Sequence, residues 1–227
     1  MEKTLTSLGK LTLPHEVIIS DGKSKDRTAE IARRFTNKVV VHTEDRRQTI
    51  AEGRNMGAAA MDASSQFAVF IDADCTIFEP DIFFTKLLTR FEEDPKLVAM
   101  NVAIRVLPEN ETISDWIIFG LFNKYLCLVN NVFHFAVSAG EFQMIRKISF
   151  DKIGGYDPRL VAAEDVDLFQ RLSKIGNVRF GNGLTIYHTG RRAHKIGLPK
   201  LLWLWILNPL WMMVRGRSYS AEWHPIR

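Results

Sequence analysis

The sequence predicts an α/β fold in which a mixed, mostly parallel β-sheet carries helices on both faces. Two observations support this class: short apolar runs alternate with helix-length segments, and several of the runs end at acidic turns. Alternating strands and helices are typical of parallel sheets that are covered on both sides. The length of 227 residues, with 46% hydrophobic and 25% charged residues, fits one globular domain with or without an appendage.

The first half of the chain supplies four candidate strands, each a short apolar run that indicates a buried strand. They cover residues 17–20, 38–42, 67–71 and 97–106. Helices are expected between them, because Asp26 can cap one, an alanine-rich segment favours the second and Pro80 can open the third. These expected helices cover residues 26–35, 49–63 and 80–93.

The second half is less regular. Its expected elements are an amphipathic helix, broken strand pieces, a turn and a second helix, at residues 112–129, 132–146, 154–158 and 164–175. The strand pieces break at Ala139-Gly140. The last helix opens with Glu164 and Asp165, and acids in a first turn suit the positive end of the helix dipole.

Aspartates follow two of the expected strands. Asp21 comes after the strand at 17–20, and Asp72 comes after the strand at 67–71. Ligands of open α/β sheets bind at the carboxyl ends of the strands. The two acidic turns therefore predict a nucleotide or metal site at this edge of the sheet.

The chain is mildly basic, with a formal net charge of +4 and a pI of about 9.1. Its clustered basic residues suit phosphates or acidic lipids, although Arg33-Arg34 fits a solvated helix face better. Nucleic acid is not an expected partner, because no basic motif interleaved with aromatic residues is present. Cys75 and Cys127 lie far apart and indicate neither a disulfide framework nor a zinc site, so a reducing cytoplasm fits.

Asp72-Ala73-Asp74 is the candidate metal site. Two carboxylates one residue apart at a strand end can present oxygens to a hard divalent cation. Mg²⁺ typically takes one or two carboxylates together with substrate phosphates. Two solvated turn aspartates are the alternative when the motif is considered alone.

Two other acidic segments have both a chemical and a structural interpretation. One carboxylate of Glu164-Asp165 can act as a general base where a substrate hydroxyl lies within hydrogen-bond reach. The pair can equally cap the helix that it opens. Asp21 can accept hydrogen bonds from a base or a ribose, or it can close a turn, and both roles can hold together.

Several segments occur in a characteristic order: EVIISDGKSKDRT, EGRNMGAAAM, FAVFIDADC, SAGEF and GGYDPRLVAAEDVDLFQRL. Together they resemble the family-2 glycosyltransferases with the Rossmann-like GT-A fold, from about residue 8 to residue 190. The resemblance implies transfer of a sugar from a nucleotide-diphospho-sugar to an acceptor hydroxyl.

The resemblance also implies roles for single residues. Asp165 is the implied catalytic base with Glu164 beside it, and Asp74 is the implied ligand of Mn²⁺ or Mg²⁺. His188 is a further candidate metal ligand, with a buried or capping histidine as the alternative. The residues implied for nucleotide-sugar binding are Asp21, Arg54, Asn55, Asp72, Gly140 and Glu141.

This set of residues suits direct displacement with inversion of configuration. A divalent ion on Asp74 neutralises negative charge on the leaving diphosphate. Asp165 takes the proton from the acceptor hydroxyl as that oxygen attacks the anomeric carbon. The Gln-x-x-Arg-Trp motif of processive synthases is absent from the sequence, which favours addition of a single sugar.

The beginning of the chain departs from the family pattern. The family normally starts with a strand that ends in a Pro-Thr-Tyr-Asn-like segment, whereas residues 5–13 already resemble the helix that follows it. The first strand is therefore expected to be missing from the sheet. The alternative function is an N-terminally truncated, non-catalytic nucleotide-binding module of the same fold.

Residues 196–227 are expected to form an apolar, Trp-rich tail after a catalytic domain at residues 1–195. The apolar core of the tail is shorter than the about 20 residues that a spanning helix needs. Its tryptophans and flanking cations favour a helix at the membrane interface through residues 196–217, with a helix packed on the domain as the alternative. The resemblance to short membrane-associated members implies a glycan or lipid-linked acceptor at the cytoplasmic face of the cell membrane.

Overall fold

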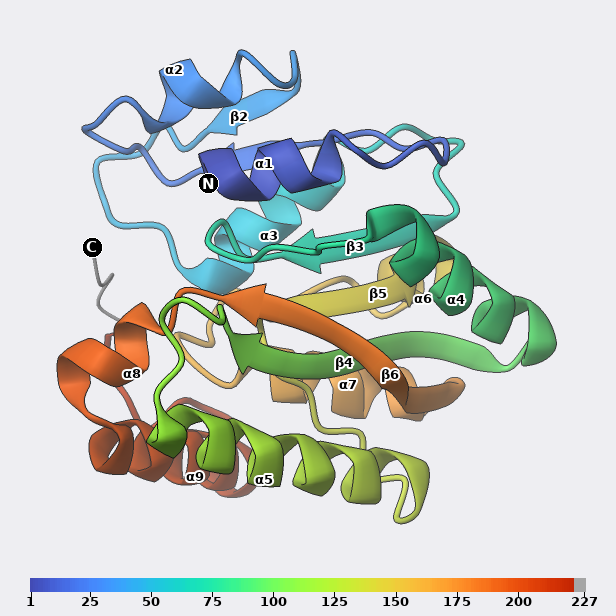
Figure 1. Ribbon diagram of the computed structural model, residues 1–227, viewed down its shortest axis with the longest axis vertical. Helices are drawn as coiled ribbons and strands as arrows, with labels where there is room; N and C mark the ends of the chain where they lie inside the picture. Colours follow the sequence, from blue (N-terminus) through green and yellow to red (C-terminus); the bar gives the residue numbers. More distant parts are fainter. Residues whose placement is uncertain (223–227) are drawn as a thin grey trace.

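The computed structural model describes residues 1–222, and Figure 1 shows their arrangement. The strands are β1 (Ile19–Asp21), β2 (Val39–Val41), β3 (Phe67–Ile71), β4 (Leu97–Val106), β5 (Phe142–Arg146) and β6 (Asn177–His188). The helices are α1 (Glu2–Leu8), α2 (Thr28–Ala32), α3 (Ile50–Ala59), α4 (Pro80–Glu93), α5 (Ile113–Asn131), α6 (Lys147–Lys152), α7 (Glu164–Ser173), α8 (Arg191–Ile196) and α9 (Leu198–Arg215). Residues 223–227 of the expected tail lie outside the described residues.

A four-stranded sheet with the order β3-β5-β4-β6 forms the centre of the molecule. β5 runs antiparallel to both of its neighbours, β3 and β4, whereas β4 and β6 are parallel. β3, β4 and β6 therefore point in the same direction, and their carboxyl ends share one edge. The sheet is mixed, as the sequence predicts.

Hydrophobic clusters cover both faces of this sheet. Met100, Val102 and Ile104 of β4 belong to the cluster that includes side chains of α4 and α5. Ala99 belongs to the cluster that includes side chains of α6 and α7. Successive side chains of a strand point to opposite faces, so β4 can contribute to both clusters. The predicted covering of both faces by helices is confirmed.

Most elements of the first half lie where the sequence predicts them. β3, α4 and β4 have the predicted bounds, and α3 begins at a capping box in which Thr49 and Glu52 bond reciprocally. α2 is shorter than the expected helix at 26–35. These elements are encoded locally, by apolar runs and by helix-capping residues.

Two expectations for the second half are wrong. Residues 132–141 contain no strand. The side chain of Asn130 donates to the carbonyl oxygen of Val137 and accepts its N–H, each at 2.8 Å. These two bonds satisfy the backbone groups that a neighbouring strand would otherwise bind. β6 was not predicted, because Gly181-Asn182-Gly183 has the composition of a turn. In the structure these residues form an irregularity, at which the pairing with β4 shifts from Val102–Gly181 to Ala103–Thr185.

The smaller sheet consists of β1 and β2, which pair in parallel through three residue pairs. No strand precedes Ile19 in the part of the chain that the structure describes. Within these residues no ladder joins β1 to β3. α1 lies close to this junction (Figure 1), where Thr4 donates to the carbonyl oxygen of Ala73 at 2.7 Å.

α9 packs on the domain through one face. Leu201, Asn208 and Met212 are buried, and Trp205 packs against the cluster of α4 and α5. Pro209 lies inside the helix. Among the helices of residues 1–222, α9 included, none has the length and hydropathy that crossing a membrane requires.

Candidate active site

The acidic loop Asp72-Ala73-Asp74 lies at the carboxyl end of β3. The N–H of Asp72 donates to the carbonyl oxygen of Glu141 at 3.2 Å, and the N–H of Cys75 donates to that of Asp72 at 3.0 Å. Since β5 pairs with β3 in antiparallel register, the residues that precede β5 lie beside the residues that follow β3. Gly140 and Glu141 therefore lie beside the acidic loop, as expected for residues of the same site.

Arg54 of α3 connects this loop to α7. Its Nη2 donates to Asp72 Oδ1 at 3.1 Å and to the carbonyl oxygen of Gly140 at 2.7 Å, and its Nη1 donates to Glu164 Oε1 at 3.1 Å. The guanidinium carbon lies 5.3 Å from the ring centre of Tyr156. Only 11% of the Arg54 side chain is exposed. One buried cation therefore unites residues from three separate segments.

The charges around Arg54 are strongly coupled. Burial opposes the charge of Arg54, but Tyr156 and the carboxylates around it outweigh this effect and raise the pKa of the guanidinium. Burial, with Asp72 nearby, raises the pKa of Glu141 to about 7. Burial and Asp74 likewise raise the pKa of Asp72, against the effect of Arg54. Carboxyl groups with such shifts are typical of functional sites.

Glu164 and Asp165 open α7, after Ala163 has taken the left-handed conformation with a φ of 62°. Glu164 is buried and bonded to Arg54, whereas Asp165 is partly exposed and its Oδ1 accepts the N–H of Val166 at 2.9 Å. Burial raises the pKa of both carboxyls, and Asp165 raises that of Glu164 further. Asp165 is therefore the more accessible carboxylate of the pair.

Asp74 is held by residues that follow β6. Its Oδ2 accepts from Thr189 Oγ1 at 2.6 Å and from Arg191 Nη2 at 3.0 Å. Burial acts to raise the pKa of Asp74, but the hydrogen bond from Thr189 and the charge of Arg191 lower it below the usual value. The carboxylate is thus kept ionised, as a metal ligand must be, while Arg191 supplies the positive charge.

His188 is the last residue of β6. Its Nδ1 accepts the N–H of Gly190 at 3.3 Å, and its Nε2 is buried without a hydrogen-bond partner among the described residues. Burial lowers the pKa of His188, with Asp74 acting in the opposite direction. The neutral imidazole is the form that binds metal ions. A ring nitrogen that accepts a hydrogen bond carries no proton, so in neutral His188 with this bond the proton is on Nε2, and this tautomer cannot bind a metal ion through Nε2. The ionised Asp74 fits a divalent ion, whereas coordination by His188 stays a prediction. In residues 1–222 no group of three or more His, Cys, Asp or Glu is arranged around one point.

Asn55 fixes the backbone of Tyr156. Its side chain donates to the carbonyl oxygen of Tyr156 at 2.8 Å and accepts the N–H of the same residue at 2.9 Å. Tyr156 is buried, and its hydroxyl donates to Gln143 Oε1. Asn55 thereby holds in place the ring that lies against Arg54, and its contact with a nucleotide-sugar stays a prediction.

Asp21 lies in the smaller sheet and not in the cluster around Arg54. It ends β1, is 4% exposed, and accepts the N–H of Ser24 at 3.2 Å. The turn-closing role that the sequence allows is present in the structure. Binding of a base or a ribose by Asp21 stays a prediction.

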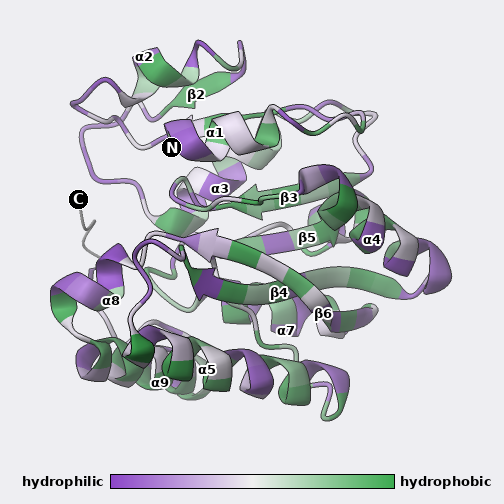
Figure 2. Cartoon of the chain, in the orientation of Figure 1, coloured by the Kyte–Doolittle hydropathy of each residue, from purple (hydrophilic) through white to green (hydrophobic). Residues whose placement is uncertain are grey.

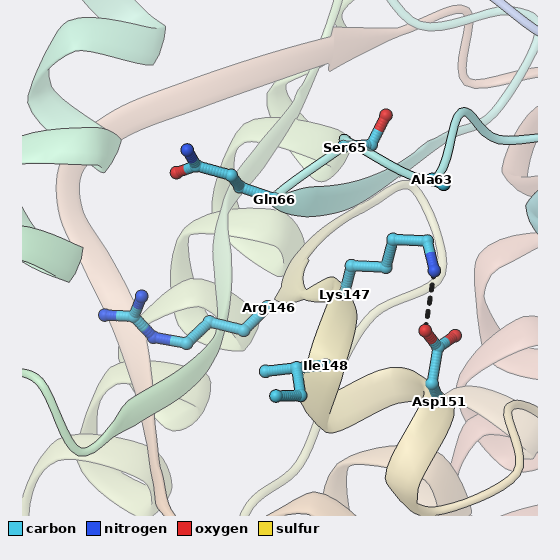
Figure 3. Close-up of a pocket in the computed structure, with 7 residues that line it drawn as sticks. All are labelled: Ala63, Ser65, Gln66, Arg146, Lys147, Ile148 and Asp151. Carbon is cyan, nitrogen blue, oxygen red and sulfur yellow. Dashed lines mark hydrogen bonds and ion pairs between the residues drawn. The ribbon is translucent and has the colours of Figure 1, made fainter.

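A hollow of about 390 Å³ lies at the opposite end of β3 (Figure 3). Gln66 and Arg146 line it, and Lys147 and Asp151 form an ion pair of 2.6 Å in its wall. Gln66 precedes β3 and Arg146 ends β5, whereas the acidic loop follows β3. The hollow is therefore separate from the residues around Arg54.

Comparison with known proteins identifies the family. The sequence model described as "Glycosyl transferase family 2" matches residues 1–154. The chain belongs to glycosyl transferase family 2. The succinoglycan biosynthesis protein ExoA of Rhizobium meliloti (strain 1021) is 28% identical over 192 residues, which are 78% of this chain and 53% of that protein. The chain thus spans about half the length of this family-2 relative.

Solved glycosyltransferase structures share the fold of this family-2 chain. The mannosyltransferase PcManGT from Pyrobaculum calidifontis, in complex with GDP-Man and Mn²⁺, has a TM-score of 0.60 at 16% identity, over 83% of this chain and 52% of that one. TarS of S. aureus has a TM-score of 0.61 at 16% identity, over 97% and 38% of the two chains. GalNAc-T7 with UDP, GalNAc and Mn²⁺ has a TM-score of 0.58 at 18% identity, over 82% and 40%. The predicted GT-A fold is confirmed.

The site contains three residues that the sequence does not predict there, Tyr156, Thr189 and Arg191. Tyr156 falls in the predicted turn at residues 154–158. Thr189 and Arg191 follow the end of β6. Their contact with Asp74 therefore depends on a strand that the sequence does not predict. Their position just after the candidate ligand His188 was the available signal.

Proposed function

We propose that this chain is an inverting glycosyltransferase, which moves a sugar from a nucleotide-diphospho-sugar to an acceptor hydroxyl. The observation that carries the proposal is the convergence of Asp72, Gly140 and Glu164 on the buried Arg54. This convergence occurs at the carboxyl edge of the sheet, where α/β folds bind their ligands. Membership of glycosyl transferase family 2 supports the class of reaction.

Asp165 is the proposed catalytic base, with Glu164 beside it. Asp165 is partly exposed, while Glu164 is held by Arg54. The pKa of Asp165 is raised toward neutral pH, and a general base is most effective when its pKa lies near the working pH. Ionised Asp165 takes the hydroxyl proton as the acceptor oxygen bonds to the anomeric carbon. The bond from that carbon to the diphosphate oxygen breaks on the opposite side, and the nucleoside diphosphate leaves with the electron pair.

Asp74 and His188 are the proposed holders of Mn²⁺ or Mg²⁺. The ionised carboxylate of Asp74 fits such an ion, and Mn²⁺ is present in the PcManGT and GalNAc-T7 structures. His188 joins Asp74 as a ligand through Nε2 in the tautomer whose proton is on Nδ1, which gives up the hydrogen bond from Gly190. When bound, the ion stabilises negative charge on the leaving diphosphate. Arg191 lies beside Asp74 and contributes a further positive charge to the same side of the site.

The proposed donor is a nucleotide-sugar. PcManGT was solved with GDP-Man and TarS with UDP-GlcNAc, which supports this class of donor without selecting the base. Asp21 is proposed to bind the base or ribose, with Asp72 on the ribose side of the metal and Asn55 in the wall of the pocket. Arg54 is proposed to line the nucleotide pocket with Asn55, and Gly140, whose carbonyl accepts from Arg54, and Glu141 are proposed to border the sugar. Arg54 therefore orients both the acidic loop and the sugar side of the site.

The proposed acceptor is a glycan or a lipid-linked glycan. ExoA, the relative at 28% identity, is named for succinoglycan biosynthesis, which supports a glycan acceptor. We further propose a catalytic domain at residues 1–195 and a tail at 196–227 that contacts the cytoplasmic face of the cell membrane through residues 196–217. The outward apolar side chains of α9 support this contact.

A non-catalytic nucleotide-binding module of the same fold is the second candidate. The divided sheet favours it, because β1, which carries Asp21, forms no ladder with β3 in the described residues. The assembled carboxylates around Arg54 oppose it. A binding module has no need of a partly exposed carboxylate with a raised pKa beside a buried one.

Transfer and hydrolysis assays test the proposal. UDP-, GDP- and dTDP-sugars are offered with Mn²⁺ to the wild type and to the Asp165→Asn, Asp74→Ala and Asp167→Asn variants. Asp167→Asn is the matched control, because Asp167 lies on the same turn of α7 but pairs with Arg171 at 2.7 Å. We expect loss of turnover in the first two variants and near-normal turnover in the control. Metal-independent turnover that neither Asp165→Asn nor Asp74→Ala reduces is the result that excludes this mechanism.

Calorimetry with UDP and GDP separates the two candidates. A catalytic chain binds a nucleotide and turns over its sugar derivative. Binding of a nucleotide without turnover of any donor identifies the non-catalytic module.

A further inference from the structure

We propose that α5 and α9 together form a docking surface for an anionic lipid bilayer. This inference rests on the proposed membrane contact of residues 196–217 and extends it to α5, a helix in the middle of the domain. The surface is defined by the outward side chains of both helices.

α5 has two apolar faces. Phe119, Leu126 and Val129 point into the domain and are buried. The other face carries large apolar side chains that are between 45% and 80% exposed, namely Ile113, Trp116, Ile117, Leu121, Tyr125, Leu128 and Val132. Their spacing of mainly three or four residues places them in one stripe along the helix. A helix that is apolar all round normally has both faces covered, so the exposed stripe indicates a binding surface.

α9 repeats this arrangement. Leu201, Asn208 and Met212 face the domain, whereas the opposite face carries apolar side chains that are between 37% and 76% exposed. The exposed members are Trp203, Ile206, Leu210, Trp211, Met213 and Val214. Each of them lies three or four residues from another member of the set, as neighbours on one side of a helix do. The tail is therefore a helix packed on the domain and, on its other side, a free apolar stripe.

The two helices are in direct contact. Trp205 of α9 stacks on Phe122 of α5 with ring centres 4.8 Å apart, and it meets Phe119 edge-on at 5.9 Å. Figure 1 shows both helices on the side of the molecule opposite to α2 and β2, and Figure 2 shows hydrophobic residues along both. The two stripes thus belong to one side of the molecule.

The charges around this surface select a negatively charged partner. In α5 the one acidic residue is Asp115, which is fully buried, and residues 191–217 contain no Asp or Glu. Exposed cations lie on or beside both helices, at Lys124, Lys195, Lys200, Arg215 and Arg217. Cations beside apolar and Trp-rich helix faces are typical of contact with anionic lipid surfaces. A second copy of this chain fits less well, because a symmetric interface places like charges of both copies together.

α8 connects the docking surface to the active site. At its start Arg191 pairs with Asp74, and near its end His194 Nε2 lies 2.7 Å from Asp115 Oδ2 in the first turn of α5. The helix that anchors the acidic loop is therefore fixed to the beginning of the proposed lipid-binding stripe. Docking through this surface brings the active-site edge close to the plane of the lipid headgroups.

Vesicle flotation of the full chain tests the proposal. Vesicles of phosphatidylcholine with phosphatidylglycerol are compared with phosphatidylcholine alone, for the wild type and for Leu121→Glu and Leu210→Glu. Ile148→Glu is the matched control, because Ile148 is 77% exposed but lies on α6. We expect preferential binding to the phosphatidylglycerol vesicles, and about tenfold weaker binding for each of the two stripe variants. The control is expected to bind as the wild type does.

Two results overturn the proposal. One is flotation of Leu121→Glu equal to that of the wild type, which removes α5 from the surface. The other is a wild type that does not bind the vesicles. A dimer that Leu121→Glu dissociates, as measured by light scattering, then identifies a second copy of the chain as the occupant of the surface. Donor hydrolysis without lipid is measured in parallel. Intact hydrolysis with failed flotation counts against docking alone, and intact flotation with failed hydrolysis counts against the proposed function alone.

Discussion

Arg54 and Arg191 both bind a carboxylate of the acidic loop, but in opposite settings. Arg54 is 11% exposed and donates to Asp72, Glu164 and the carbonyl of Gly140. Arg191 is 51% exposed and pairs with Asp74. A buried ion pair cannot lose one partner without leaving an uncompensated charge, whereas an exposed pair is worth little. The buried pair of Arg54 is the one with Glu164, whose side chain is 7% exposed. The comparison teaches that the site has a fixed side at Glu164 and a side at Asp74 that can exchange its cation.

Removal of the buried cation is expected to have the largest effect. Arg54→Ala leaves Glu164 and Asp72 without their partner, and we expect the free energy of unfolding to fall by about 3–5 kcal/mol, with loss of transfer activity. Arg54→Lys keeps the charge but not the planar set of donors. Its free energy of unfolding is therefore expected to lie between those of the wild type and Arg54→Ala. Urea unfolding monitored by circular dichroism gives the values. An Arg54→Ala protein as stable as the wild type contradicts a fixed side.

The raised pKa of Glu141 predicts how stability depends on pH. Its pKa is about 7 in the folded chain against 4.5 in the reference state. The folded protein therefore holds a proton that the unfolded chain releases, so its stability falls as pH rises from about 4.5 to about 7. The loss from this group is expected to reach at most about 3 kcal/mol. Glu141→Gln is expected to flatten the profile between these pH values, and an unchanged profile contradicts the assignment.

Asn55→Ala tests the support behind the fixed side. The change leaves the buried N–H and carbonyl of Tyr156 without their partner, so a loss of about 2 kcal/mol of unfolding free energy is expected. Asn110→Ala, at an exposed loop position, is the control and is expected to change stability by less than about 0.5 kcal/mol. Thermal and urea unfolding measure both variants. If the two variants are equally stable, the side chain of Asn55 does not stabilise the fold through the backbone of Tyr156.

Arg191→Ala is expected to have the smallest effect on stability, within about 1 kcal/mol. Its effect on metal binding is expected to be larger, because Arg191 occupies Asp74 before a divalent ion arrives. Titration calorimetry of the nucleotide-free protein should show Mn²⁺ binding several-fold more tightly than in the wild type. Weaker Mn²⁺ binding in the variant would mean that Arg191 does not compete with the ion.

The sequence predicted the elements that are encoded locally. Capping at Thr49, Pro80 at the start of α4 and the apolar runs of β3 and β4 are each contained in a few neighbouring residues. The irregular strand β6 was missed because its glycines, which serve the shifted pairing with β4, have the composition of a turn.

The candidate site residues were chosen correctly in type, but their connections were not visible. Arg54 lies 18 residues from Asp72, 86 from Gly140 and 110 from Glu164 in the sequence. A single sequence carries no signal that one guanidinium joins such distant groups. That connection depends on the antiparallel course of β5, which brings Gly140 to the loop after β3.

The small sheet of β1 and β2 has a consequence for amide hydrogen exchange. Its three residue pairs form a unit that can open while the longer ladder of β4 and β6 stays closed. The amide proton of His42, which donates to the carbonyl oxygen of Asp21 at 2.8 Å, is therefore expected to exchange with solvent long before those of β4. If Asp21, at the end of β1, binds a nucleotide, the pairing of β1 with β2 becomes coupled to donor binding. The protection of the His42 amide then reports occupancy of the donor site without a label on the donor.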